Sequence, residues 1–112
     1  MSVKLESLGA RRRTHTCGEL RRGHVGSRVI LTGWVHRVRD HGGVVFLDLR
    51  DRFGMTQVVF RPERSQDVTR AAQELGSEFV VVVEGEVGTR PENMVNRELA
   101  TGEIEEIGRA HV

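Results

Sequence analysis

Two arginines, a phenylalanine and a glutamine lie in three successive strand-like runs near the middle of the chain. Arg37 and Arg39 share the first run, Phe46 lies in the second and Gln57 in the third. A phenylalanine exposed at mid-strand can stack on an unpaired base, and arginines two residues apart project together toward phosphates or a base. A glutamine amide offers both a donor and an acceptor to the edge of a base. Together these side chains predict a β-surface that binds single-stranded nucleic acid.

Each of these residues also has a purely structural alternative. A shift of one residue in the strand register would turn Phe46 into the core, because successive side chains of a strand face opposite sides. Gln57 and the two arginines could instead be solvated surface residues. Catalysis has little support, since we find no glycine-rich phosphate loop, no nucleophile motif and no metal-ligand spacing. The histidines are scattered along the chain: His15, His24, His36, His41 and His111.

The candidate side chains need a β-framework, which the alternation of apolar residues predicts. A first strand starts at Arg28, and Gly33 within it marks a bulge or bend that would let one strand serve two faces of a barrel. A second strand spans about Gly43 to Arg50, with an aliphatic side chain at every second position. After a turn at Gly54, the run Met55 to Phe60 completes a hairpin. The phenylalanine and the glutamine then lie on the same outer surface.

The rest of the chain predicts one helix and two further strands. A helix is expected from Ser65 to Leu75, with Ser65 as its N-cap. A β-rich run from Glu78 to Val87 follows, then a polar loop from Gly88 to Gly102 and a last strand that starts near Ile104. At the other end, residues 1–12 are expected to form a mobile arm, and Thr16 to cap a short helical turn over Cys17 to Arg22.

Five strands with a helix between the third and the fourth is the order of an OB-fold. We therefore expect an all-β fold: a five-stranded OB-fold Greek-key barrel over residues 13–112, with one helix between strands 3 and 4 and a short N-terminal helical turn. Such barrels bind oligonucleotides on the face of their second and third strands, where the candidate side chains lie. With 112 residues and 38% hydrophobic content, the chain is long enough for one domain with a modest core.

Charge and cysteine content indicate the partners and the cellular compartment of this domain. Residues 1–70 carry 14 basic and 7 acidic residues, a net +7, whereas residues 71–112 carry 3 and 9, a net −6. Sixteen of the 17 basic residues are arginine, which stacks on bases and pairs with phosphate, although a GC-rich genome would give the same bias. Cys17 is the single cysteine, which fits a free thiol in a reducing compartment. No apolar run approaches the roughly 20 residues that span a bilayer, so we expect a cytoplasmic protein with no membrane partner.

Two segments taken together resemble a known family. The first reads G-W-V-H-R-V-R-D-H-G-G-V-V-F-L-D-L-R-D-R-F-G-M-T-Q-V-V-F, and the second reads N-R-E-L-A-T-G-E-I-E. Both are similar to the N-terminal anticodon-binding domain of bacterial aspartyl-tRNA synthetases, over about residues 13–107. The combination is specific, because G-W-V alone also occurs in asparaginyl- and lysyl-tRNA synthetases, which share the barrel.

The resemblance implies a role for individual residues. In the family, the phenylalanine matching Phe46 stacks on the middle anticodon base, a uridine, and the glutamine matching Gln57 hydrogen-bonds it. The arginine matching Arg39 contacts the third base. The glutamate matching Glu105 reads the guanine-like first base, and a carboxylate that accepts from guanine N1 and N2 explains an acid within an RNA site. Two more residues match polar positions of the loop that lines the anticodon: Arg90 and Asn96.

Three positions bear on affinity and specificity. Gly88 stands where many relatives carry an arginine, and Met94 stands where an asparagine is frequent, so we expect weaker binding from this loop. His41, in D-H-G-G, resembles the branch of the family that charges both aspartate and asparagine tRNAs, whereas other members have D-L-G. His41 could equally be a turn residue without a role in specificity.

The resemblance also implies what lies outside this chain. The family enzyme uses ATP and Mg²⁺ to attach aspartate to tRNA in a class II catalytic domain downstream, so the 112 residues are expected to hold no catalytic residue, metal or cofactor. The expected partner is the anticodon loop of aspartate tRNA, with asparagine tRNA added in the dual-specificity branch. We expect a monomer here and a homodimeric parent enzyme. Three alternatives remain: a general single-stranded nucleic-acid-binding OB domain, a stand-alone paralogue with a regulatory or tRNA-modifying role, and a protein-interaction barrel.

Overall fold

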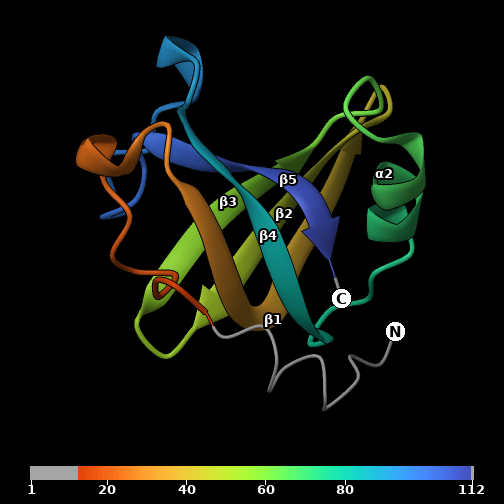
Figure 1. The fold of residues 1–112 in the computed structure, drawn as a ribbon, viewed down its shortest axis with the longest axis horizontal. Helices are drawn as coiled ribbons and strands as arrows, with labels where there is room; N and C mark the ends of the chain where they lie inside the picture. Colours follow the sequence, from red (N-terminus) through yellow and green to blue (C-terminus); the bar gives the residue numbers. More distant parts are fainter. Residues whose placement is uncertain (1–12, 112) are drawn as a thin grey trace.

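The computed structural model describes residues 13–111, in which five strands and one α-helix surround a single core (Figure 1). The predicted arm of residues 1–12 lies outside the described residues. In chain order the elements are η1 (Arg22–His24), β1 (Arg28–His41), β2 (Val44–Asp51), β3 (Gly54–Phe60), α2 (Gln66–Gln73), β4 (Val80–Thr89), η2 (Glu92–Met94) and β5 (Ile104–His111). The prediction of a mostly β domain with five strands, and with its helix between the third and fourth, is confirmed.

The long strand β1 has two partners. Its residues 28–34 pair with β4 and its residues 34–41 pair with β2, both antiparallel, so that Trp34 faces Arg50 on one side and Val80 on the other. A short parallel pairing joins β3 to β5, and β5 runs antiparallel to β4. The sheet therefore closes in the order β1-β2-β3-β5-β4.

Gly33 lies at the point where β1 changes partner. The irregularity in the pairing of β1 with β2 falls between Val35 and Arg37, two residues after the glycine. At Gly33 itself, a Cβ atom would overlap the carbonyl oxygen of Arg50. The glycine is thus required for the close approach of β1 to β2, and the bulge predicted at Gly33 occurs slightly further along the strand.

The core is aliphatic and follows the predicted alternation. Every second residue is buried in β1 as far as Val35 and throughout β2, as predicted, whereas β3 and β4 each bury several consecutive residues. The fully buried strand residues of the core cluster are Val29, Leu31, Val35, Val45, Leu47, Leu49, Val58, Phe60, Val81, Val83 and Ile104. Each side chain of this size contributes about 1.5–3 kcal/mol when it is fully buried. Ala72 and Leu75, from α2 and the residues after it, close one end of this core.

The helix α2 begins and ends close to the predicted residues. Ser65 is its N-cap, and the Ser65 hydroxyl accepts a hydrogen bond of 3.2 Å from the backbone N–H of Val68. The helix contacts β2, β3 and β5, on the side of the molecule away from η1 and η2 (Figure 1). No helix among residues 13–111 is long and apolar enough to cross a membrane.

The N-terminal segment is held by a carboxylate. The helical turn predicted over Cys17 to Arg22 is not confirmed; the structure has a turn over Cys17–Glu19, and the 3-10 helix η1 starts only at Arg22. Asp51 accepts hydrogen bonds from the backbone N–H groups of Cys17 (2.8 Å), Phe53 (2.8 Å) and Gly54 (3.1 Å). Burial raises the pKa of the Cys17 thiol, and the nearby Asp51 carboxylate raises it further, so Cys17 is an uncharged structural thiol.

An acidic side chain is buried in the core. Glu106 is 0% exposed, and neither of its carboxyl oxygens has a hydrogen-bond partner among the described residues. Glu106 pairs with Val58 of β3 and with Val87 of β4, two core residues. Burial raises the pKa of Glu106 well above its usual range, and the charge of Glu84 adds to this effect. The folded protein therefore favours the protonated, neutral carboxyl.

We expect the buried acid to make stability fall with rising pH. In the unfolded chain Glu106 ionises near the ordinary pKa of about 4.3, whereas the folded state retains the proton to higher pH. Since the folded state binds more protons, stability is complete below the unfolded pKa and is lost as the pH rises toward the folded pKa. Above both pKa values, this loss amounts to about 1.4 kcal/mol for each unit by which the folded pKa exceeds the unfolded one.

Urea unfolding across this pH range measures the effect. Glu106→Gln has no titrating group at this position, so its free energy of unfolding should depend less on pH than that of the wild type. Glu98→Gln, which removes an exposed carboxylate from the β4–β5 loop, is the matched control and should leave the slope unchanged. Equal slopes for the wild type and Glu106→Gln would contradict the assignment.

Candidate nucleic-acid interface

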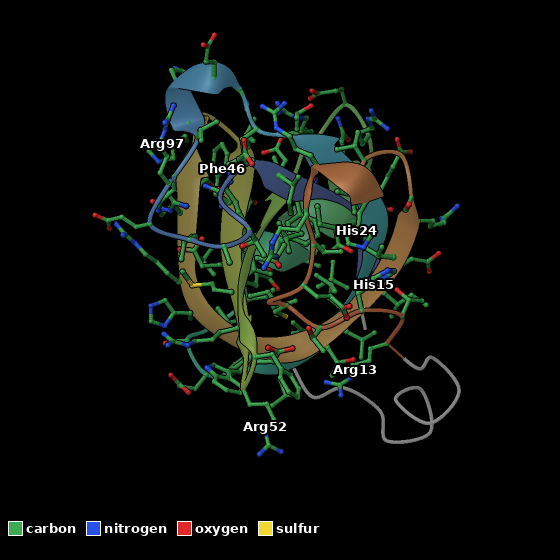
Figure 2. All side chains as sticks on the ribbon, turned by 90° about the vertical axis from the view of Figure 1, so that its left-hand side faces the viewer. Arg13, His15, His24, Phe46, Arg52 and Arg97 are labelled. Carbon is green, nitrogen blue, oxygen red and sulfur yellow. The ribbon has the colours of Figure 1, made fainter. Side chains whose placement is uncertain are left out.

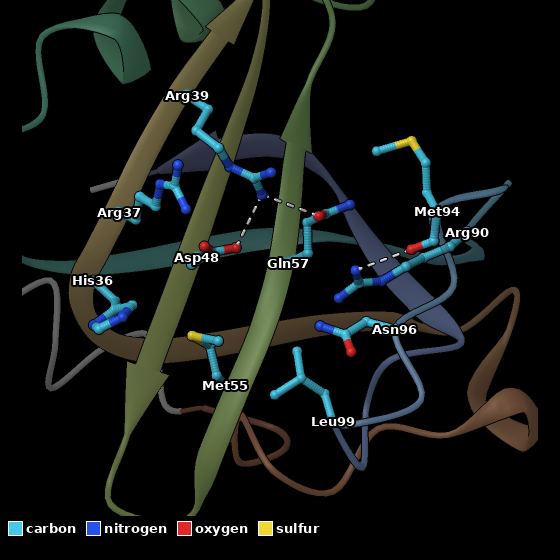
Figure 3. Close-up of a pocket in the computed structure, with 10 residues that line it drawn as sticks. All are labelled: His36, Arg37, Arg39, Asp48, Met55, Gln57, Arg90, Met94, Asn96 and Leu99. Atoms are coloured by element: carbon cyan, nitrogen blue, oxygen red, sulfur yellow. Dashed lines mark hydrogen bonds and ion pairs between the residues drawn. The ribbon is translucent and has the colours of Figure 1, made fainter.

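A pocket of about 450 Å³ opens on the outer face of β1, β2 and β3, and the loop between β4 and β5 forms its other wall (Figure 3). The strands contribute mostly polar side chains, and the loop contributes both polar and apolar ones. The lining residues are His36, Arg37, Arg39, Asp48, Met55, Gln57, Arg90, Met94, Asn96 and Leu99. Three strands and one loop that are far apart in the sequence thus meet at one site.

The structure brings most of the predicted site residues together. Those that line the pocket are Arg37, Arg39, Gln57, Arg90 and Asn96. The other three lie beside it. Glu105 reaches the pocket through a hydrogen bond to Gln57, while Phe46 and His41 lie next to Arg39 at the end of the β1–β2 hairpin.

A chain of polar contacts runs across the floor of the pocket. The Arg39 guanidinium donates to Asp48 Oδ1 (3.4 Å) and to Gln57 Oε1 (3.3 Å). The Gln57 amide nitrogen donates to Glu105 Oε2 (3.3 Å). These contacts fix the orientation of the Gln57 amide, with its oxygen toward Arg39 and its nitrogen toward Glu105. All three are longer than the common hydrogen-bond distance of about 2.9–3.0 Å, so a ligand can replace them at low cost.

Burial changes the acid–base properties of Glu105. Glu105 is 4% exposed, and burial raises its pKa, while the hydrogen bond from Gln57 and the charges of Arg61 and Arg90 lower the pKa in part. Gln57 itself is on the predicted outer face of β3 but is only 3% exposed, because the loop covers that side of the strand. The two side chains are therefore held in a partly desolvated site, where a hydrogen bond is stronger than in water.

Arg90 is a structural residue of the loop as well as part of the pocket wall. Its guanidinium donates to the backbone carbonyl oxygens of Ile104 (2.9 Å) and Met94 (3.4 Å), and the side chain is largely buried. Burial lowers the pKa of Arg90, an effect that the charges of Asp48 and Glu105 oppose. With both of these carbonyls bound, Arg90 holds the loop against β5.

Phe46 contacts two side chains of β1, Arg39 and His41. The centre of its ring is 5.6 Å from the Arg39 guanidinium carbon and 5.7 Å from the centre of the His41 ring, which meets it edge-on. Val45 and Leu47 on either side are fully buried, whereas Phe46 is partly exposed. Phe46 is therefore on the outer face of β2, and the alternative of a core residue is excluded.

Four lining residues were not predicted: His36, Asp48, Met55 and Leu99. Asp48 and Met55 each lie two positions from a predicted residue on the same strand, so the strand period could have identified them. Leu99 belongs to the irregular part of the loop, where no period exists to indicate which way a side chain points. Among residues 13–111, no group of three or more histidine, cysteine or acidic side chains could hold a metal ion.

The fold and the pocket together define a nucleic-acid-binding barrel. The family model of the tRNA anticodon type, described as an OB-fold nucleic acid binding domain, matches residues 29–107, so the chain belongs to this family. Aspartate-tRNA(Asp/Asn) ligase of Desulfatibacillum aliphaticivorans is 56% identical over 98 residues, which cover 88% of this chain and 16% of that protein. The chain thus spans about a sixth of the length of this curated relative.

Two solved structures share the fold. Asparaginyl-tRNA synthetase from Pyrococcus horikoshii, complexed with asparaginyl-adenylate, aligns with a TM-score of 0.73 and 27% identity, over 88% of this chain and 21% of that one. OBody AM2EP06, bound to hen egg-white lysozyme, aligns with a TM-score of 0.78 and 26% identity, over 90% of this chain and 92% of that one. The architecture thus occurs both within a tRNA synthetase and as a separate domain.

The loop wall of the pocket depends on Gly102. A Cβ atom at this position would overlap the carbonyl oxygen of Asn96, whose backbone N–H in turn donates to the Gly102 carbonyl (3.0 Å). We expect Gly102→Ala to displace Asn96 and Leu99 and to speed amide hydrogen exchange in the loop, while the strands remain protected. Gly23→Ala, where a Cβ atom meets nothing within 4 Å, is the matched control. Unchanged exchange in the loop of Gly102→Ala would contradict this role.

Proposed function

We propose that this domain reads the anticodon of aspartate tRNA, and of asparagine tRNA, for a longer aspartate-tRNA ligase. The observation that carries the proposal is the contact chain from Arg39 through Gln57 to Glu105, which lies beside a partly exposed phenylalanine. Membership of the tRNA anticodon family supports it. So does the 56% identity to an aspartate-tRNA(Asp/Asn) ligase.

The middle base of the anticodon, uridine, fits Phe46 and Gln57. Uracil presents one N–H donor between two carbonyl acceptors, and the Gln57 amide presents an acceptor and a donor in a fixed orientation. Phe46 is partly exposed beside Arg39, which contacts this amide, and a base can stack on the Phe46 ring. The base would replace the long hydrogen bonds that Gln57 makes to Arg39 and Glu105 in the free protein.

The first base, guanine, fits Glu105. An ionised carboxylate accepts two hydrogen bonds side by side, which matches the N1–H and N2–H donors of guanine. Adenine lacks this pair of donors, and the pyrimidines are too small to present it at the same place. Glu105 is largely desolvated, so the wrong base would leave a buried carboxylate unpaired.

The third base sets the difference between the two tRNAs, since GUC and GUU differ only there. Arg39, which we assign to this base, can only donate hydrogen bonds. Cytosine and uracil both present an O2 acceptor, so a single arginine contact does not distinguish them. His41 meets the Phe46 ring edge-on, and we assign to His41 the tolerance of both bases.

The remaining lining residues bind less specifically. Arg37 is exposed at the pocket edge and would contact the RNA backbone, while Arg90 and Asn96 present the loop to it. Met94 offers no strong donor to RNA, and Gly88 offers no side chain, so the loop should add little affinity. The ligase activity, with its ATP, Mg²⁺ and homodimeric assembly in the cytoplasm, belongs in this proposal to the longer protein.

Binding to anticodon stem-loops tests the proposal. At fixed salt, the purified chain should bind loops that carry GUC and GUU with similar affinity, and should bind a loop with an unrelated anticodon more weakly. Preference for GUC alone would remove the dual specificity assigned to His41. Equal binding to all three loops would favour a general single-strand-binding domain, and no binding would favour a protein-interaction barrel.

Substitutions at Phe46 and Gln57, which we assign to the middle base, refine the test. Phe46→Ala and Gln57→Ala should each weaken binding to the GUC loop by roughly 1–3 kcal/mol, the usual contribution of one stacked base. Phe79→Ala and Gln73→Ala, which change exposed residues outside the pocket, are the matched controls. Unchanged affinity in a folded Phe46→Ala variant would remove the stacking role.

Lowering the pH should weaken the binding of guanine by Glu105. The protonated form of Glu105 cannot accept two hydrogen bonds from guanine, and burial raises the Glu105 pKa above that of an exposed carboxyl. Affinity for the GUC loop should therefore fall as the pH decreases, beginning at a higher pH than an exposed glutamate would give. Glu105→Gln should bind weakly at all pH values and lose this dependence. A wild type whose affinity does not change on acidification would contradict the role of Glu105.

A further inference from the structure

The tip of the β2–β3 hairpin carries an exposed aromatic ring with two guanidinium groups nearby. Phe53 is 56% exposed, more than any other large apolar side chain of the described residues. The guanidinium carbons of Arg13 and Arg52 lie 5.5 Å and 5.7 Å from the centre of its ring. Figure 2 shows Arg13 and Arg52 at one end of the molecule and Phe46 toward the other. The ring stabilises no core, so the fold alone does not explain its position.

The turn presents this ring on a rigid backbone. The Asp51 carboxylate binds the N–H groups of Phe53 and Gly54, at 2.8 Å and 3.1 Å. A Cβ atom at Gly18 would overlap the carbonyl oxygen of Phe53, so the turn is packed directly against the N-terminal segment. Binding of a ligand at the tip therefore costs little conformational entropy, because the backbone of the turn is already ordered.

The tip is continuous with the pocket. Arg50 is exposed and lies two residues after Asp48, hence on the same face of β2, and it pairs across the sheet with Met55 of β3. Asp48 and Met55 both line the pocket. Arg52 follows two residues later. At about 3.3 Å per strand residue, β2 extends the surface roughly 13 Å from Asp48 to the tip.

The arginines of this surface are available for an anionic ligand. Among the described residues, no carboxylate lies within ion-pair distance of Arg13, Arg50 or Arg52. The nearest acid in sequence, Asp51, is 8% exposed and directs its oxygens at backbone N–H groups. Unpaired guanidinium groups bind phosphates through two parallel hydrogen bonds.

We infer that the hairpin tip is a second RNA-binding surface, which holds the RNA backbone next to the anticodon. Arg50, Arg52 and Arg13 bind its phosphates, and Phe53 stacks on a nucleotide outside the three anticodon bases. The inference rests on the proposed function, because it extends the same RNA beyond the pocket. RNA fits better than a protein segment, since phosphates match a row of arginines that continues from the pocket and has no ion-pair partner among residues 13–111.

The double variant Arg52→Ala/Phe53→Ala tests this inference. Both side chains are exposed, so the fold should survive, which circular dichroism and thermal unfolding would verify. Binding to the GUC stem-loop should weaken on the order of tenfold, and the dependence of log K on log salt should become shallower by about one phosphate contact. Binding to the GUC trinucleotide, followed by NMR titration, should be unchanged. Arg70→Ala, an exposed arginine on α2, is the control for net charge and should lower affinity much less.

The outcomes separate this inference from the proposed function. A wild type that does not distinguish anticodons would overturn the proposed function and the inference with it. A wild type that distinguishes them, together with a double variant of unchanged stem-loop affinity and salt slope, would overturn the inference alone and leave the tip to a protein partner. Equal weakening toward the stem-loop and the trinucleotide would also overturn it, because the tip would then act through the pocket.

Discussion

The change of partner along β1 is the constraint on which the site depends. In the closed barrel, β1 pairs with β4 along its first half and with β2 along its second half, and the strand bends between the two halves (Figure 1). At Gly33, β1 lies so close to Arg50 that no side chain fits between them. From this point β1 and β2 continue as a pair, with Arg37 opposite Asp48 and Arg39 opposite Phe46. Because the sheet closes through β5 and β4, the loop between these two strands reaches the outer face of β3. Without this closure, the loop and the strands would not share a pocket.

The polar groups of the pocket are only partly satisfied in the free protein. Arg39 has a buried Nε without a partner among the described residues, and its other contacts are long. A polar network of this kind costs stability that an apolar surface would not, and it is maintained where a ligand completes it. The orientation of the Gln57 amide is set in advance by an acceptor on one side and a donor on the other. The free protein thus fixes the orientation of the Gln57 amide, while the hydrogen bonds that hold it remain long.

The sequence predicted the strands well, because burial on one face leaves a period of two that is read directly from valine and leucine positions. The order of strands and helix then placed Phe46, Gln57 and Arg39 on one face. The alternation could not indicate which strand residues are buried by segments outside their own strand. Gln57 is covered by a loop that starts more than 30 residues later, and Glu106 breaks the apolar pattern of the core that it occupies. Both depend on contacts between distant segments, which local pattern does not encode.

The pairing of β3 with β5 has a consequence for folding during synthesis on the ribosome. It is the shortest of the five pairings, with Val58 and Val59 of β3 aligned beside β5, and β5 is the last described strand to be synthesised. At roughly 5–20 residues per second, β1 to β4 emerge seconds before it. During that interval Arg90 lacks the Ile104 carbonyl and Gln57 lacks Glu105. If the proposed function holds, a nascent domain gains selective RNA binding only once β5 has docked, because both contacts depend on that strand.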